Sequence, residues 1–300
     1  MTVILFALSL VTIYPGAGTA GFDFLHISPT AREAALAGAA VSRPQGAMGF
    51  FYNPAILSQG GTNNGELTYI NYPAGIHLGS VGYVQPLGTN KGVGIGIFYL
   101  NSGTIKRTND QGEEMGTFGS SYLNLNLSGG LRIIDRLALG LAFSGLYGAI
   151  DTFFSLGVAG NLGITYEIPD YHIHFGFAAS NLGVEVKTFG GYRNPLPLEI
   201  ALGASWEPIT ALNLNASIHK PIDNRWNFRA GIEGWVNEYL VLRGGYYSLG
   251  ADLAYGGGGD VLAGFTTGLG IRYQRYQIDY AFIPMVVLGI THRLSLSFSL

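Results

Sequence analysis

The sequence contains no cysteine and very little charge. Only 12 % of its 300 residues are Asp, Glu, Lys or Arg, against about 25 % in ordinary soluble domains. Without cysteine the chain has neither disulfides nor thiolate metal sites. The formal net charge of −3 gives no basic surface for nucleic acid, so no nucleic-acid partner is expected.

Long hydrophobic runs are also missing, although the chain is apolar. Hydrophobic residues make up 48 % of the sequence, with 46 glycines, 17 phenylalanines and 18 tyrosines. A membrane-spanning helix needs about 18 or more consecutive apolar residues, and no segment approaches that length. High apolar content without such a run is typical of alternating strands that cross a membrane.

Strict alternation is clearest at the end of the sequence. Apolar residues alternate there with Arg293 and serines, which is the pattern of a strand with one apolar and one polar face. We expect this strand to pair with the first strand and close the sheet. We also interpret its apolar residues as the signal for the barrel assembly machinery; they are Leu294, Leu296, Phe298 and Leu300.

The same alternation recurs from about residue 66 onward. It predicts an all-β fold, a transmembrane up-and-down antiparallel barrel of about 14 strands. The expected strands cover 66–72, 76–86, 91–101, 120–132, 137–148, 155–167, 171–183, 197–207, 210–219, 225–236, 239–248, 262–274, 276–283 and 288–300. Prolines such as Pro169 and Pro208 fall in the expected connectors or at strand ends, as ladder hydrogen bonding requires.

The connectors alternate between short and long. Those after even-numbered strands are brief, whereas three that follow odd-numbered strands are long: 102–119, 184–196 and 249–261. Outer-membrane barrels have tight periplasmic turns and longer external loops. We therefore predict the outer membrane of a diderm bacterium, with lipid around the barrel and the long loops outside.

Residues 1–20 have the pattern of a secretory signal peptide. The apolar run from Val3 to Tyr14 is too short to span a membrane, and Gly18-Thr19-Ala20 is a small-residue cleavage site. We expect export through this signal peptide. The alternative is a buried N-terminal strand.

Residues 21–65 lack the alternation and are predicted to plug the barrel, which then spans 66–300. Thr30 and Glu33 fit a capping box, so a short helix is expected over 31–37, ended by Gly38. A barrel of about 14 strands is too wide for its own side chains to fill, so a plug is physically reasonable. The alternative is a loose periplasmic tail.

Polar residues on the strands are expected to face the lumen. They are Asn124, Asn126, Asn213, Asn215, Arg229, Glu233, Arg243 and Asp279. Within the plug, we expect Arg32 to lock the segment through charge-assisted hydrogen bonds and Asn53, before Pro54, through amide bonds to the backbone. The alternative for all of these residues is that their side chains are simply solvated by water in the lumen.

No arrangement of residues predicts catalysis. There is no nucleophile elbow, phosphate loop or metalloprotease motif, so an enzyme is not expected and no cofactor or metal is predicted. His172 and His174 share a strand face, but rim or lumen residues are the preferred interpretation. His292 shares the phase of the lipid-facing Leu294, which requires either an interfacial position or a bulge.

Three segments together resemble the PorV/PorQ family, relatives of the FadL channels. They are Phe24-Leu25-His26-Ile27 with the Ala31–Gly38 segment, Asn53-Pro54-Ala55, and the ending from Leu288 to Phe298. The resemblance implies a fourteen-stranded barrel with an N-terminal hatch. It also implies a non-catalytic role in type IX secretion, docking exported proteins or secretion-system subunits on the outer loops.

A FadL-like channel for long-chain fatty acids or other hydrophobic compounds is the alternative. In that case the hatch must move, and an apolar pocket must lie inside the barrel.

Overall fold

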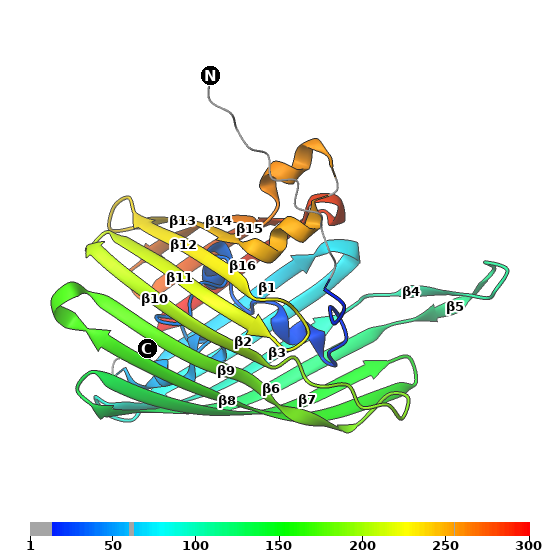
Figure 1. Cartoon of the computed structure of the whole chain (residues 1–300), viewed down its shortest axis with the longest axis horizontal. Coiled ribbons are helices and arrows are strands. Elements are labelled where there is room, and N and C mark those ends of the chain that lie inside the picture. The colour runs from blue at the N-terminus through cyan, green and yellow to red at the C-terminus, as the bar shows by residue number, and fades with distance from the viewer. Residues whose placement is uncertain (1–13, 60–62, 255) are drawn as a thin grey trace.

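The computed structural model describes residues 14–59, 63–254 and 256–300. Strands dominate it, and 14 of them form one closed antiparallel barrel (Figure 1). The barrel strands are β1 (Asn64–Tyr72), β2 (Ile76–Pro86), β3 (Lys91–Asn101), β6 (Ser120–Ile134), β7 (Leu137–Ile150), β8 (Phe153–Ile168), β9 (Ile173–Lys187), β10 (Glu199–Ile209), β11 (Leu212–Pro221), β12 (Asn227–Trp235), β13 (Leu240–Tyr247), β14 (Phe265–Tyr273), β15 (Tyr276–Pro284) and β16 (Ile290–Ser299). The predicted fold is confirmed, with every strand boundary within four residues of its expected position.

Closure joins the first and last strands, as the terminal alternation predicts. Asn64 pairs with Ser299 and Leu67 with Leu296, and Leu300 donates its amide to the carbonyl oxygen of Asn63 at 2.8 Å. With every neighbouring pair of strands hydrogen-bonded, the barrel has no open edge.

The outer face of the barrel is apolar all the way round. Each barrel strand presents at least one exposed large apolar side chain, namely Leu67, Val81, Ile95, Leu127, Phe143, Val158, Phe175, Leu202, Ile218, Ile232, Leu242, Ile271, Ile278 and Leu294. Their neighbours along each strand point inward. A surface of this kind is stable against hydrocarbon rather than water.

Among the described residues, no helix has the length and apolarity needed to cross a membrane.

The long connectors contain more structure than the sequence indicates. Residues 102–119 form a hairpin of β4 (Ile105–Thr108) and β5 (Glu114–Phe118), which extends away from the barrel in Figure 1. Strand β9 continues to Lys187, so the loop predicted over 184–196 begins later. The third connector contains two 3-10 helices, η6 (Ser248–Leu253) and η7 (Gly258–Leu262).

Two expectations about single residues are settled. Pro208 lies inside β10 rather than in a connector, because the pairing with β11 shifts register between Trp206 and Ile209 and needs no amide there. At His292 the pairing with both neighbours is continuous, so no bulge reverses its phase. Its Nδ1 lies 2.7 Å from the hydroxyl of Tyr280.

Residues 21–59 enter the lumen and fill its middle (Figure 1, blue). Their helices are η1 (Asp23–His26), α1 (Ala31–Ala35), η2 (Gly49–Phe51) and η3 (Pro54–Ser58); two further 3-10 turns, η4 (Pro73–Gly75) and η5 (Pro169–Tyr171), connect barrel strands, and η8 (Val286–Leu288) precedes β16. Helix α1 contacts β13 to β16, and η3 contacts β3 and β6 to β8. We refer to residues 21–59 as the plug.

The predicted capping box is wrong in detail. Thr30 makes no side-chain bond to the helix backbone; its hydroxyl instead donates to Oε2 of Glu33 at 2.5 Å. Glu33 is occupied by Arg32 and by the amide of Gln45, so it does not return to the Thr30 amide. The helix also stops at Ala35, because Ala37 and Gly38 adopt positive φ values of 56° and 75°.

The predicted signal peptide falls largely on residues 1–13, outside the described residues. The described segment that follows lies at the long-loop end of the barrel. There Lys220 lies over the ring of Tyr14 at 5.3 Å, and Gly16 is next to the carbonyl of Asp223. The chain therefore passes through the lumen from the long-loop end to the short-turn end, where β1 begins.

Candidate functional site

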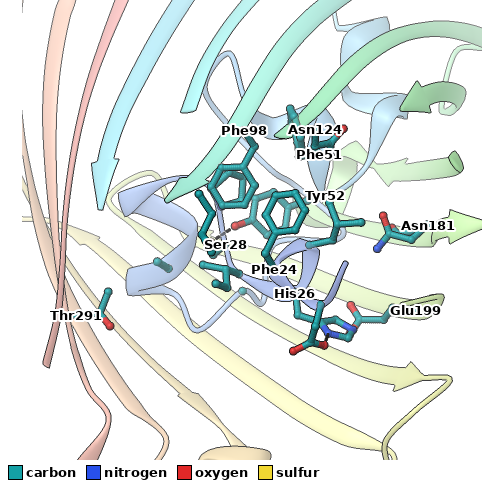
Figure 2. A pocket seen from close by; sticks show the side chains of 18 of the residues that line it. Phe24, His26, Ser28, Phe51, Tyr52, Phe98, Asn124, Asn181, Glu199 and Thr291 are labelled. Carbon is teal, nitrogen blue, oxygen red and sulfur yellow. Dashed lines mark hydrogen bonds and ion pairs between the residues drawn. The ribbon is translucent and has the colours of Figure 1, made fainter. Parts of the chain in front are cut away.

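A cavity of about 640 Å³ lies in the lumen between the plug and the long loops. Figure 2 shows residues that line it, from the plug and from several barrel strands. This volume is within the usual range of about 300–1,000 Å³ for small-molecule sites. The cavity is the candidate functional site.

One side of the cavity is aromatic and aliphatic. The ring of Phe24 in the plug stacks on Phe98 of β3 at 5.6 Å and approaches Tyr122 of β6 at 5.5 Å (Figure 2 shows the first pair). The buried apolar cluster around them includes Ile70 and Leu78. These side chains point into the lumen, where the sequence analysis expects polar residues.

The sequence does contain a signal for this apolar wall. On β3 the inward phase is glycine at 92, 94 and 96 and then changes to Phe98 and Leu100. Both faces of the strand are therefore apolar from Ile97 to Leu100, whereas a strand facing a wet lumen alternates. This departure from alternation marks the part of the wall that touches the cavity.

A second side of the cavity is charged. Glu199 of β10 accepts a hydrogen bond from Nη2 of Arg229 at 3.1 Å, and its other oxygen lies 2.8 Å from Nδ1 of His219. The Arg229 guanidinium also borders Gly38 of the plug. Arg229, on β12, therefore contacts both the plug and β10, which lies two strands away in the barrel.

Arg293 of β16 also lines the cavity but lacks an acidic partner. It is 6 % exposed, its Nη1 donates to the carbonyl of Ser28, and its Nε has no hydrogen-bond partner in the described part of the chain. Among the described residues no carboxylate forms an ion pair with it. A buried guanidinium without an anion is costly, so this group is suited to an anionic ligand.

On the short-turn side of the cavity, Arg32 joins the plug to the barrel. Its Nε and Nη2 donate to the two carboxylate oxygens of Glu233 on β12 at 2.9 and 2.8 Å, and its Nη1 donates to Glu33 at 2.8 Å. Burial would lower the pKa of Arg32, but the charges of Glu233 and Glu33 more than offset it and raise that pKa. The guanidinium therefore stays charged.

The network continues along the wall. Arg243 on β13 donates to Glu233 at 2.6 Å and to Asp279 on β15 at 2.6 Å. All of these side chains are at most 6 % exposed. The structure thus brings together Arg32, Glu233, Arg243 and Asp279, which the sequence analysis selects separately, while Arg229 belongs to the cavity wall.

Asn53 makes the second attachment of the plug. Its Nδ2 lies 2.8 Å from the carbonyl of Val41, 3.1 Å from that of Ile164 on β8 and 3.3 Å from that of Phe177 on β9. Its Oδ1 accepts the amide of Ala55 at 3.1 Å, capping η3 with Pro54 at the first helical position.

Glycines in the barrel wall make room for this turn. Gly92, Gly130, Gly140 and Gly163 are register partners across β3, β6, β7 and β8. A Cβ on Gly140 would lie 2.1 Å from the carbonyl carbon of Pro54, and one on Gly163 would lie 2.0 Å from Oδ1 of Asn53. We call these four residues the glycine row. It seats the plug backbone directly on the sheet, and the sequence analysis missed it.

The remaining histidines stay apart from the cavity. His172 ends η5 in a left-handed conformation at the short-turn end, and His174 begins β9. Neither belongs to a metal-compatible group of side chains among the described residues.

Comparison with known proteins identifies the fold. No protein-family model matches the chain, and no curated protein matches its sequence. Several solved structures, however, match the chain. A deletion mutant of TodX, a monoaromatic hydrocarbon channel, superposes with a TM-score of 0.65 at 14 % identity, covering 90 % of this chain and 99 % of that one. The CymD monoaromatic hydrocarbon channel gives 0.65 at 12 %, covering 93 % and 99 %.

A Pseudomonas aeruginosa FadL homologue gives a TM-score of 0.62 at 13 % identity, covering 91 % of this chain and 99 % of that one. At such low identity the likeness concerns the fold. This chain accordingly has the FadL-like fold, a closed barrel of 14 antiparallel strands around an N-terminal plug.

Proposed function

We propose that this protein is an outer-membrane channel that takes up small hydrophobic or amphipathic molecules through the cavity above the plug. The observation that carries the proposal is this cavity, whose aromatic wall includes Phe24 and Phe98 and whose polar groups include the unpaired Arg293. The apolar outer belt supports a membrane location, and the short-turn end then faces the periplasm. Export through a signal peptide and insertion by the barrel assembly machinery belong to the same proposal.

The comparisons support this function through the proteins that share the fold. TodX and CymD are described as monoaromatic hydrocarbon channels, and TodX also as the Pseudomonas putida toluene transporter. They favour the channel, the alternative of the sequence analysis, over docking by a PorV/PorQ-type protein. They also favour a non-catalytic role.

Docking of exported proteins remains a prediction with one supporting observation. The β4–β5 hairpin projects beyond the barrel (Figure 1). Its side chains Met115 and Ile105 are exposed. Exposed apolar side chains on a projecting hairpin are compatible with a protein partner.

The preferred ligand has an apolar body and an anionic group. The apolar body packs on the aromatic wall, while a carboxylate satisfies the Nε of Arg293. A fatty acid fits this description, and so does an aromatic acid.

Replacing Arg293 with methionine tests the site. Because a hydrogen bond to a charged group contributes about 1.5–3 kcal/mol, the affinity for octanoate is expected to fall about tenfold or more. The affinity for uncharged 1-octanol is expected to change less than about twofold. Equilibrium binding to the purified barrel in lipid nanodiscs measures both.

Two further variants complete the test. Phe98→Ala is expected to weaken both ligands, because a large buried ring is lost from the apolar wall. Arg275→Met, at an exposed position of the short-turn end, is expected to weaken neither. Unchanged octanoate affinity in both Arg293→Met and Phe98→Ala would show that the cavity is not the binding site.

A further inference from the structure

A group of metal-compatible side chains lies at the edge of the cavity, outside the groups described so far. Asp23 and His26 come from η1 of the plug, and Asp223 comes from the connector between β11 and β12. One ligand atom from each lies within 4.8 Å of the others. Asp23 and His26 also line the cavity, and Figure 2 shows His26 next to Glu199.

Asp223 provides an independent indication of a ligand. This side chain is 6 % exposed, and its Oδ1 has no hydrogen-bond partner in the described part of the chain. Burial of a carboxylate oxygen without a partner is unfavourable, and such groups in native proteins are usually paired or bound to a metal. Within the cluster, His26 is the one side chain that can carry a positive charge.

The other two residues are already held in a suitable arrangement. Nδ1 of His26 lies 2.8 Å from Oδ1 of Asp23, which orients the imidazole at the rim. Asp23 is more than half exposed, so solvent and ions reach the cluster. Nearby Glu199 is engaged by Arg229 and His219 and need not act as a ligand.

The donor set selects the class of ion. One imidazole nitrogen with two carboxylates suits zinc and similar divalent transition metals, whereas calcium and magnesium prefer oxygen ligands alone. Zinc bonds to nitrogen and carboxylate oxygen are about 2.0–2.2 Å long, so ligand atoms around a tetrahedral ion lie about 3.4 Å apart. The ligand atoms lie within 4.8 Å of one another, and one pair is 2.8 Å apart, so small shifts of side chains on a short turn and a loop reach this spacing.

We propose that Asp23, His26 and Asp223 bind one zinc ion or a similar divalent transition metal. The ion ties η1 of the plug to the β11–β12 connector, residues that are about 200 positions apart in the sequence. Three protein ligands leave a fourth position open at the cavity edge. The metal site does not depend on the proposed transport function. The sequence analysis predicts no metal, so the proposal departs from it.

Metal titration of the full-length barrel tests this site. The protein is purified with a tag that contains no histidine, stripped with chelator, and titrated with zinc by calorimetry and with cobalt(II) by visible absorption. We expect one saturable zinc site per chain and the absorption bands of tetrahedral cobalt. Asp223→Asn and His26→Gln are each expected to weaken zinc binding about tenfold or more.

Controls make the result specific. Asp23→Asn replaces an exposed side chain, so it reports on the site even if the buried Asp223→Asn variant fails to fold. His172→Gln, at the opposite end of the barrel, is expected to bind zinc as the unmodified protein does. Absence of saturable binding in the unmodified protein would overturn the proposal. So would a zinc affinity in both Asp23→Asn and His26→Gln that equals that of the unmodified protein.

Discussion

Replacing Arg32 with methionine is expected to release the plug and open the barrel to ions. The substitution leaves Glu33 without its cation and Glu233 with Arg243 alone, all of them buried. Breaking a buried ion pair in this way costs about 3–5 kcal/mol, which corresponds to an increase of about two to four orders of magnitude in the open population. Single-barrel currents in planar lipid bilayers measure the fraction of time spent conducting.

Arg43→Met is the matched control within the plug. Arg43 pairs with Glu207, but both side chains are about one quarter exposed, and such a pair contributes about 0–1 kcal/mol. This variant should conduct like the unmodified protein. If Arg32→Met also stays closed while it folds normally, the ion network does not hold the plug.

Replacing Gly140 with valine is expected to displace the plug from the glycine row. The new Cβ would lie 2.1 Å from the carbonyl carbon of Pro54 and 2.2 Å from the amide nitrogen of Ala55, so backbone atoms must move. Overpacking of a tight interior costs about 1–3 kcal/mol or more, and a flexible side chain cannot relieve this contact. We expect higher bilayer conductance and protease cleavage within residues 21–59.

Gly145→Val on the same strand is the control for this experiment. A Cβ at Gly145 meets no atom within 4 Å, so the barrel and the plug should both be unaffected. Protection of the plug from protease in Gly140→Val, equal to that in Gly145→Val, would show that the glycine row does not seat the plug.

Much of the barrel follows from the sequence because strand side chains alternate between two faces. The period of two locates the strands, and prolines and connector lengths confirm where they end. The same period identifies Asn126, Glu233, Arg243 and Asp279 as inward-facing, and each is buried in the structure. The hydrogen-bonding chemistry of Arg32 and Asn53 also selects two residues that attach the plug to the wall.

Other predictions fail because a tertiary contact outweighs the local sequence rule on which they are based. The capping box at Thr30 is replaced by a side-chain bond, because Glu33 is needed by Arg32 and Gln45. Tyr122 of β6 points into the lumen against Phe24, although the residues facing the lumen are predicted to be polar. In both cases the partner comes from tertiary packing, and the local sequence pattern does not reveal it.

Strand position, side-chain facing and barrel closure are determined by the sequence alone, since alternation is a local property of each strand. Only the tertiary structure decides which inward residues meet. The register of four strands aligns the glycine row, the path of the plug brings Arg32 to Glu233, and the loop after β11 brings Asp223 to His26. These contacts join residues far apart in the chain, and they arise from how the plug packs inside the closed wall rather than from any local preference.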